Sequence, residues 1–416
     1  MRLPFAADEL KERLQSVENA RGVTEQTRRM EGAQRDLVSV QAAPAPDSDA
    51  IKQFGSELFE AILPADVRSC YRRSLDRARE QGKGLRLRLR FEAAELALLP
   101  WEFLYDAQES AHICLLNETP IIRYLELTRP PQPLTIEPPL RILGMVASPG
   151  DLPALDVAKE KQQMAAAIEH LTEAGYISLN WLDGQSWRDL QKAIRHGPWH
   201  IFHFIGHGGF ESQSGEGLLA LADENGNTHK LPASKLGLLL AGHDSMRLAI
   251  LNACEGARAS ESNIFSSAGS VLIQRGIPAV VSMQYEITDK AALEFSRTFY
   301  DALADGIPID ASVTEARKAI SIALDDSMEW GTPVLHMRSP DGRLFKIDVA
   351  GAIFQKAPPA PTAAPETVPK TATASVAATV PAPATATATD EVRRGLLILL
   401  NKVKQFWVDG VLEKSL

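Results

Sequence analysis

The stretch WHIFHFIGHGG, residues Trp199–Gly209, joins a run of apolar and aromatic residues to three glycines that surround a histidine. The run up to Ile205 predicts a buried β-strand, because a short apolar run bounded by glycines is typical of a strand covered on both faces. The glycines after it indicate a loop at the end of the strand. His207 then has two interpretations: a residue of a tight turn, or a catalytic group held at the mouth of a sheet.

Five further apolar segments follow the same pattern and alternate with amphipathic helices. We expect strands at residues 140–148, 176–182, 199–205, 247–253, 278–283 and 333–337. Ser186 and Asp189 have capping-box spacing at the start of one helix, and another helix runs from near Thr288 to Gly306. Near-continuous apolar strands that alternate with helices predict an α/β fold, with a mostly parallel sheet of about six strands covered on both faces.

The composition indicates a globular protein of the reducing cytoplasm. The chain has 416 residues, 45% of them hydrophobic, and a formal net charge of −9. This acidic excess argues against a general nucleic-acid binder, which normally carries a basic excess. No apolar run approaches the roughly 20 residues that span a bilayer, and we expect no signal peptide. Cys70, Cys114 and Cys254 are far apart, which favours free thiols over a disulfide framework.

Composition also divides the chain into regions. Residues 1–47 are expected to be a partly helical, flexible segment, residues 48–130 an N-terminal α/β part, and residues 138–348 the core. Within the α/β part, the segment LRLRLRFE (Leu85–Glu92) alternates leucine with arginine. This alternation predicts a strand with a buried leucine face and a solvated arginine face. Pro, Ala and Thr dominate residues 357–389, which predicts a disordered linker.

An amphipathic helix is expected after the linker, at residues 390–416. Its apolar residues fall roughly on one helical stripe: Leu396, Leu399, Leu400, Val403, Phe406, Trp407 and Val411. A lone amphipathic helix must bury that stripe, against a partner, a second copy of the chain, or a further domain. A membrane-surface helix is disfavoured because the charges of the segment are mixed rather than strongly basic.

Two of the expected strands deliver reactive side chains at their carboxyl ends, where open parallel sheets gather ligands. The strand at 199–205 leads to His207, and the strand at 247–253 leads to Cys254. If the two strands are neighbours, the imidazole and the thiol project into one cleft. A neighbouring histidine raises the thiolate fraction of a cysteine, and the same imidazole can protonate a leaving amine. The N–H groups of Gly208 and Cys254 would then face a developing oxyanion.

Several motifs, in this order, resemble those of a known group of cysteine peptidases. HFIGHGG is followed by LNACEG, with 47 positions from His207 to Cys254. This pair is similar to the caspase-related peptidases of clan CD, and specifically to the bacterial CHAT domains. The resemblance covers roughly residues 50–345, and it also includes the segments LALLPWEFLYD, NETPIIRYL, VLIQRGIPAVVSMQYEITDKAALEFSRTFYDAL and ASVTEARKAI. Asn252 and Glu255 depart from the caspase pattern, so the chain is not a caspase proper.

The resemblance implies a caspase-like three-layer sandwich that hydrolyses peptide bonds without a cofactor or metal. His207 matches the family's general base and acid, Cys254 its nucleophile, and Gly208 its oxyanion-hole glycine. The group resembles triggered effectors of bacterial defence or cell death, so we expect a protein substrate and a regulatory partner or fused module at residues 390–416. The alternative is a catalytically silent CHAT-like scaffold that recruits partners through the C-terminal helix.

Other chemistries have less support. His203 and His207 have the HxxxH spacing of helical zinc sites, but the segment is a predicted strand and no acidic third ligand has a matching spacing. The spacing from Cys254 to Arg258 is C-x3-R, which is too short for the C-x5-R loop of phosphatases. GHGGF lacks the lysine of a P-loop. His200 and His203 are expected to be structural, and a Cys254 without its histidine would be a small buried hydrophobe.

In the architecture that the resemblance implies, loops after the first, third and fifth strands line the substrate pocket. These loops carry Asp151, Glu286 and Asp289, with Met283 and Tyr285 as possible walls. An acidic pocket would select Lys or Arg before the scissile bond, as in separase-like relatives, rather than Asp as in caspases. Asp289 has a second interpretation, because an acidic residue stabilises a helix N-terminus on its own.

Overall fold

The structure is a computed structural model of the chain. It describes residues 48–91, 94–97, 99–125, 130–211, 216–254, 264–324, 327–347 and 411–413. The expectations for residues 1–47, 357–389 and 390–410 lie outside the described residues. The described part is built around a ten-stranded mixed sheet.

The middle of this sheet consists of the six segments expected from the sequence. They are β7 (Leu140–Ala147), β8 (Ile177–Trp181), β9 (Ile201–Glu211), β12 (Leu248–Cys254), β13 (Ala279–Met283) and β14 (Pro333–Met337). Their spatial order is β8-β7-β9-β12-β13-β14, and every neighbouring pair is parallel except β13 and β14. The predicted α/β class with a mostly parallel sheet is confirmed. The carboxyl ends of β7, β9, β12 and β13 therefore meet at one edge, where ligands of such sheets bind.

The sheet is wider than the six strands that the apolar runs predict. The strands β5 (Ile121–Tyr124) and β2 (Leu87–Leu89) continue it beyond β14, and β10 (Glu216–Ala222) and β11 (Thr228–Pro232) form a hairpin on the outer half of β9. The hairpin turns between Ala222 and Thr228, where Gly226 has a φ of 80°. The N-terminal α/β part is thus continuous with the core, because it supplies two strands of the same sheet.

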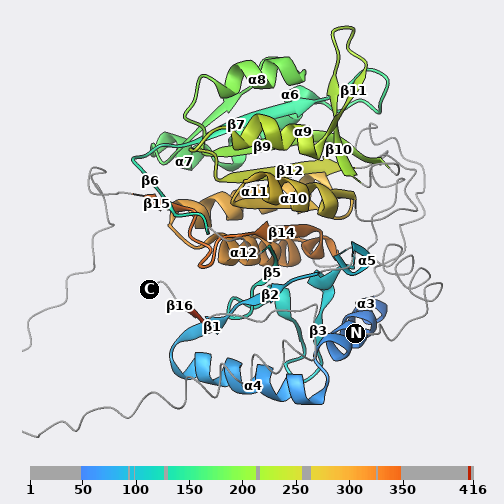
Figure 1. Cartoon of the computed structure of the whole chain (residues 1–416), viewed down its shortest axis with the longest axis vertical. Helices are drawn as coiled ribbons and strands as arrows, with labels where there is room; N and C mark the ends of the chain where they lie inside the picture. Colours follow the sequence, from blue (N-terminus) through green and yellow to red (C-terminus); the bar gives the residue numbers. More distant parts are fainter. Residues whose placement is uncertain are drawn as a thin grey trace, which may run out of the picture.

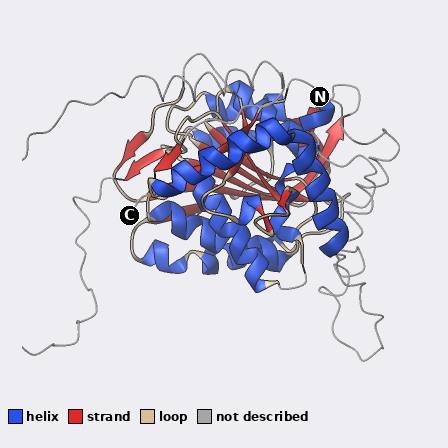
Figure 2. Cartoon of the chain, turned by 90° about the horizontal axis from the view of Figure 1, so that it is seen from below, coloured by secondary structure: helices blue, strands red, loops and turns tan. Residues whose placement is uncertain are grey.

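Helices cover both faces of the sheet, which makes three layers (Figures 1 and 2). One face packs against α6 (Val157–Ala167), α7 (Glu169–Glu173), α11 (Asp289–Ala304) and α12 (Ile309–Ala323), and the other against α8 (Trp187–Ile194), α9 (Ala233–Ala241) and α10 (Ile264–Arg275). The predicted starts of α8 and α11 are confirmed. Ser186 accepts from the Asp189 N–H, and Thr288 accepts from the Ala291 N–H, as N-cap side chains do.

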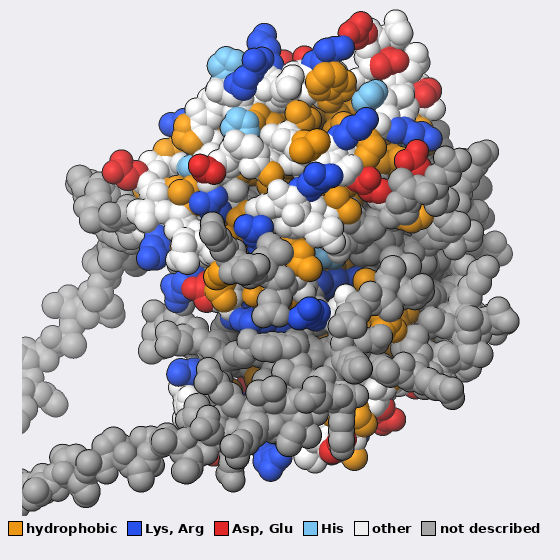
Figure 3. Space-filling model, in the orientation of Figure 1, with side chains coloured by type: hydrophobic (Ala, Val, Ile, Leu, Met, Phe, Trp, Pro, Cys, Tyr) orange, Lys and Arg blue, Asp and Glu red, His pale blue; other side chains and the backbone are white. Residues whose placement is uncertain are grey.

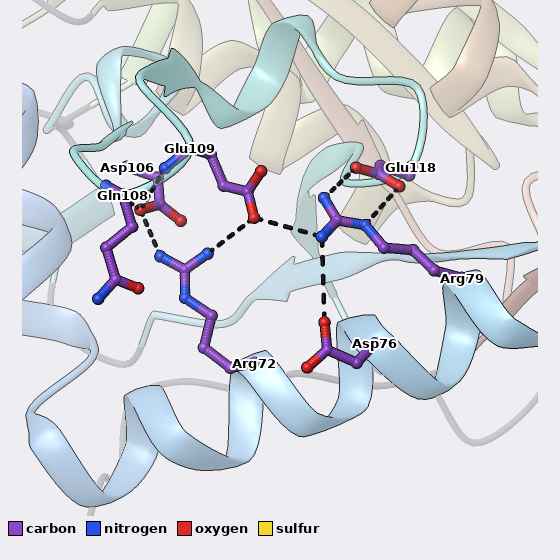
Figure 4. A network of polar contacts seen from close by, with 7 residues as sticks. All are labelled: Arg72, Asp76, Arg79, Asp106, Gln108, Glu109 and Glu118. Carbon is purple, nitrogen blue, oxygen red and sulfur yellow. Dashed lines mark hydrogen bonds and ion pairs between the residues drawn. The ribbon is translucent and has the colours of Figure 1, made fainter.

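The N-terminal helices α3 (Ser48–Ile62) and α4 (Ala65–Glu80) pack beside the end of the sheet that β2 forms (Figure 1). A network of ion pairs joins α4 to residues 106–118 (Figure 4). Arg79 pairs with Glu118 at 3.0 Å and with Glu109 at 3.2 Å, and Arg72 pairs with the buried Asp106. The other short elements are β1 (Lys83–Leu85), α5 (Ala94–Ala97), η1 (Trp101–Phe103), β3 (Tyr105–Asp106), β4 (Ala111–His112), η2 (Ile113–Leu115), β6 (Leu134–Ile136), η3 (Glu329–Gly331) and β15 (Phe345–Ile347).

The solvated arginine face predicted for Leu85–Glu92 is wrong. Arg86 and Arg88 are only 3% and 7% exposed. The Arg86 Nε lies 2.6 Å from a carboxylate oxygen of Asp310 on α12, and the Arg88 guanidinium lies 4.6 Å from the Tyr124 ring centroid. Alternation along a strand reports two different faces but not what covers them, and here α12 and the segment 339–343 cover the arginine face.

The helix predicted for residues 390–416 is wrong at its described residues. Val411–Glu413 forms strand β16, which pairs antiparallel with β1, Glu413 opposite Lys83. An edge that offers backbone hydrogen bonds favours an extended conformation at a β-branched residue such as Val411.

The surface of the described part carries mixed charge. Figure 3 shows basic and acidic side chains interspersed with apolar ones on the face drawn. Within the described ranges, no helix is both long enough and apolar enough to cross a bilayer.

Candidate active site

The carboxyl ends of β9 and β12 bring His207 and Cys254 next to one another. The two strands are parallel neighbours, and their register pairs Leu248 with Ile201 at one end and Cys254 with His207 at the other. Neighbouring strands lie about 5 Å apart, so the backbones of the two residues run side by side. The side chain of Cys254 and residues 255–263 lie outside the described part of the chain.

A backbone carbonyl orients the His207 ring. Its Nε2 lies 2.7 Å from the oxygen of Pro153, in the loop that follows β7, and the residue is 7% exposed. Because a carbonyl oxygen only accepts hydrogen bonds, Nε2 carries the proton. In the neutral ring, Nδ1 is then the nitrogen that can accept another proton. Pro153 thus fixes the tautomer and the orientation of the imidazole, as a carboxylate does in a Ser-His-Asp triad.

The loop that carries Pro153, residues 148–156, is anchored at both ends. At its start, the Ser148 N–H donates to Oε1 of Gln185 at 2.7 Å. Further along, the Gly150 N–H donates to the Gly226 carbonyl at 2.8 Å, in the turn of the β10–β11 hairpin. At its end, Asp156 caps α6. These bonds hold the loop over the edge of the sheet without any contribution from an apolar core.

The predicted substrate ligand Asp151 belongs to these anchors. Its carboxylate accepts from the Thr228 N–H at 2.8 Å and from the Thr228 hydroxyl at 2.7 Å, at the start of β11. The Thr228 bonds lower the pKa of Asp151, because they stabilise the charged form. The structure therefore uses this carboxylate to tie the loop to the hairpin.

Gly206–Gly209 forms strand, not the loop that its glycines predict. The outer half of β9 pairs antiparallel with β10, which places Ala220 opposite His207. Pairing with β10 supplies the stability that glycine lacks as a strand former. Gly206 is required for packing, because a Cβ there would come within 2.5 Å of the Phe204 ring.

A small pocket lies on the face of the sheet that carries His203 and Ile205. Residues of α6, β9, β12 and α11 line it, and its polar lining residues are Glu160, Gln163, His203, Asn252, Asp289 and Ser296. Asn252 is two residues before Cys254 on β12, so the pocket lies beside the end of this strand. The Asp289 carboxylate lies 2.7 Å from Nζ of Lys159, and both side chains are nearly half exposed. Glu160 and Asp289 therefore place two carboxylates at the pocket.

The other predicted pocket residues lie elsewhere. Met283 and Tyr285 are 2% and 8% exposed and pack in the core, where the Tyr285 ring centroid lies 6.3 Å from that of Phe103. Glu286 is half-buried in the loop after β13. Of the five predicted substrate residues, Asp289 is the one that lines this pocket.

His203 and His200 make internal hydrogen bonds. The Nδ1 of His203 lies 2.8 Å from the Tyr300 hydroxyl, and the Nδ1 of His200 accepts from the Arg141 N–H at 3.0 Å. Burial lowers the pKa of each imidazole to about 4, because desolvation disfavours the charged ring. Among the residues that the structure describes, no three His, Cys, Asp or Glu side chains form a group that could hold a metal ion.

The comparison with protein families assigns the chain to a family. The CHAT domain model matches residues 52–340, which is more than half of the chain. The chain belongs to the CHAT domain family. The mixed sheet with helices on both faces agrees with the caspase-like sandwich that this membership implies.

Two solved structures are distantly similar to this CHAT protein. The Saccharomyces cerevisiae separase–securin complex matches with a TM-score of 0.34 and 15% identity, over 59% of this chain and 15% of the matched chain. The Arg-specific cysteine proteinase gingipain R matches with a TM-score of 0.40 and 12% identity, over 81% and 75% of the two chains. This CHAT chain thus spans only a small part of the separase length. A comparison with curated proteins gives no match.

Two features of the site were not predicted from the sequence. The Pro153 carbonyl is a backbone group, so no residue type signals its role. Asn252 could have been found, because it shares an alternating strand face with Cys254 and precedes it by two residues.

Proposed function

We propose that this CHAT protein is a cysteine endopeptidase in which His207 and Cys254 form the catalytic dyad. The observation that carries the proposal is the register of β9 and β12, which pairs the two residues across neighbouring parallel strands. The hydrogen bond from His207 Nε2 to Pro153 adds an oriented base to that pairing. A histidine beside a cysteine at the carboxyl edge of a parallel sheet has the arrangement that nucleophilic catalysis requires.

In the proposed reaction, Nδ1 of His207 acts both as a base and as an acid. Nδ1 accepts the proton of the Cys254 thiol, and the thiolate attacks the carbonyl carbon of the peptide bond. The imidazolium then gives its proton to the leaving amine, and the acyl group stays on sulfur as a thioester. Water, deprotonated by the same nitrogen, hydrolyses the thioester and restores the thiol. Throughout, the bond to Pro153 stabilises the imidazolium by accepting from Nε2.

The oxyanion of the tetrahedral intermediate needs hydrogen-bond donors. The backbone N–H groups of Gly208 and Cys254 are proposed for this role. Cys254 ends β12 and pairs with His207, and Gly208 is the next residue of β9. Donors fixed by strand pairing need no reorganisation during the reaction, and one such donor is worth about 3–4 kcal/mol of transition-state stabilisation.

A basic side chain before the scissile bond is the substrate feature that fits the pocket. Asp289 and Glu160 supply negative charge, and the amide of Asn252 supplies a neutral hydrogen-bonding group. Because Lys159 pairs with Asp289, a substrate Lys or Arg must compete with it for the carboxylate. The substrate on this proposal is a partner protein, and the enzyme is a regulated effector of bacterial defence or cell death.

The test is cleavage of a peptide library by the purified full-length chain, with Arg, Lys, Leu and Asp compared before the scissile bond. We expect cleavage after Arg and Lys, and loss of turnover by at least about 10³-fold in Cys254→Ala. Cys70→Ala on α4 is the matched control, since Cys70 lies in the N-terminal helices, and it should cleave as the wild type does. Cleavage that persists in Cys254→Ala contradicts the proposal. An inert wild type with an unreactive Cys254 would favour the scaffold alternative.

A further inference from the structure

The loop between β13 and α11, residues 284–288, connects the edge of the sheet to the wall of the pocket. The β12–β13 register pairs Leu251 with Ser282, and one more step along both strands opposes Asn252 and Met283. The loop therefore starts one strand away from the end of β12. It ends at Asp289, which lines the pocket together with Asn252. Any shift of this loop moves the acidic side of the pocket.

A buried ion pair from the N-terminal part of the chain holds the start of this loop. Glu102 in η1 and Arg123 in β5 lie 2.9 Å apart, and their side chains are 1% and 4% exposed. The Gln284 amide bridges them, since its Nε2 donates to Glu102 at 2.9 Å and its Oε1 accepts from Arg123 at 3.1 Å. Nε2 also lies 2.7 Å from the Gly331 carbonyl. The neutral Gln284 amide thus donates to the buried Glu102 carboxylate and accepts from the buried Arg123 guanidinium.

A second buried carboxylate holds the end of the loop. Glu329 is 2% exposed and accepts from the Thr288 N–H at 2.6 Å and from the Thr288 hydroxyl at 3.1 Å. Thr288 in turn caps α11, so the first turn of the helix that carries Asp289 is fixed to the same carboxylate. Between these anchors, Tyr285 packs near the ring of Phe103 in η1. Hydrogen bonds therefore hold both ends of the loop to buried carboxylates of other segments, Glu102 at its start and Glu329 at its end.

We infer that Gln284 is a positioning residue: through it, the buried Glu102–Arg123 pair fixes the loop that carries the acidic wall of the pocket. The inference rests on the proposed function, because it takes this pocket as the site of the substrate side chain. It gives the N-terminal part of the chain a role in substrate recognition. Residues from η1 and β5 set the pocket although they do not line it.

Glu102→Gln is a poor test, because it leaves Arg123 and the nearby Arg317, 3.9 Å from Glu102, without their buried counter-charge. Gln284→Met keeps the volume and the ion pair but removes all of the Gln284 side-chain hydrogen bonds. We expect this variant to raise KM for the cleaved peptide about tenfold with kcat changed less than about threefold. Deuterium uptake by the amides of residues 284–288 should rise in parallel.

The control is Asp310→Asn, which removes a carboxylate from another buried pair, Arg86–Asp310, at the first turn of α12. It should lower thermal stability and leave both KM and the uptake of 284–288 unchanged. The inference is overturned if Gln284→Met shows wild-type uptake in the loop, or if its KM rises no more than that of the control. If the wild type cleaves no peptide, the proposed function fails, and the exchange measurement alone still decides whether Gln284 holds the loop.

Discussion

Strand β9 carries two histidines, and its inner and outer halves give them opposite surroundings. His203 lies in the inner half, where β7 and β12 flank the strand and α11 covers it, and its ring is bonded to the Tyr300 hydroxyl. His207 lies in the outer half, where β10 has joined the strand, and its ring is bonded to a loop carbonyl. The two histidines are four positions apart, one bonded to a side chain of α11 and the other to the loop after β7.

The contrast shows that position along the strand decides the role of a histidine here. Burial lowers the pKa of His203 to about 4, so its ring stays neutral at physiological pH. His207 has a bond partner that fixes one nitrogen, and the paired strand delivers a cysteine beside it. On the proposed function, the same residue type is structural inside the sheet and reactive near its carboxyl edge.

The largest effect that separates the two histidines is expected in turnover. His207→Gln should lower kcat by about 10³-fold or more, because it removes the group that both accepts and donates the proton. His203→Gln should lower thermal stability and change kcat by less than about tenfold. Comparison of kcat for the best peptide checks this. Equal losses in the two variants would mean that His207 has no special role.

A second difference concerns acid stability. The pKa of His203 is about 4 in the folded chain and about 6.5 unfolded, so the unfolded state binds the extra proton. The contribution of this histidine is complete above about pH 6.5 and is lost as the pH falls towards 4. Between pH 6.5 and 5 the free energy of unfolding should drop by about 2 kcal/mol for this group. Denaturant titrations at several pH values measure it, and His203→Gln should reduce the slope by one proton. An unchanged slope would refute the assignment.

The smallest effect concerns the loop that orients His207. If Asp151 anchors this loop through Thr228, then Asp151→Asn and Thr228→Val should each lower kcat about three- to tenfold with KM unchanged. If Asp151 instead binds a basic substrate side chain, Asp151→Asn alone should raise KM for peptides with Arg or Lys. Steady-state kinetics of the two variants separates these roles.

The inner half of β9 was predictable from the sequence, and the outer half was not. Apolar runs specify buried strands directly, so residues 199–205 and the other core strands were found. The glycines at 206, 208 and 209 are poor strand formers, and pairing with β7, β12 and β10 keeps this segment extended. The prediction of a solvated arginine face at Arg86 and Arg88 was wrong for a similar reason. The helix that covers this face, α12, is more than 200 residues away in the sequence.

The candidate site shows the same limit. The pairing of His207 with Cys254 on neighbouring strands could be predicted from the order of the strands, and their proposed chemistry from residue type. The Pro153 carbonyl could not, because every residue has one. Met283 and Tyr285 were expected as pocket walls, but both are buried in the core. Apolar residues at the end of a strand can pack in the core or line a pocket, and the sequence pattern is the same in both cases. Only the packed helices show which of the two occurs.

The most direct test of the His207–Cys254 pair is the pH dependence of Cys254 alkylation by iodoacetamide, in a Cys70→Ser background. Burial raises the pKa of Cys114 to about 12, so that thiol should stay unmodified. We predict rapid alkylation of Cys254 at pH 6.5. In His207→Gln the rate should fall about tenfold or more, because the pKa of the thiol then returns towards its ordinary value near 8.5. Identical rate profiles with and without the imidazole would contradict it.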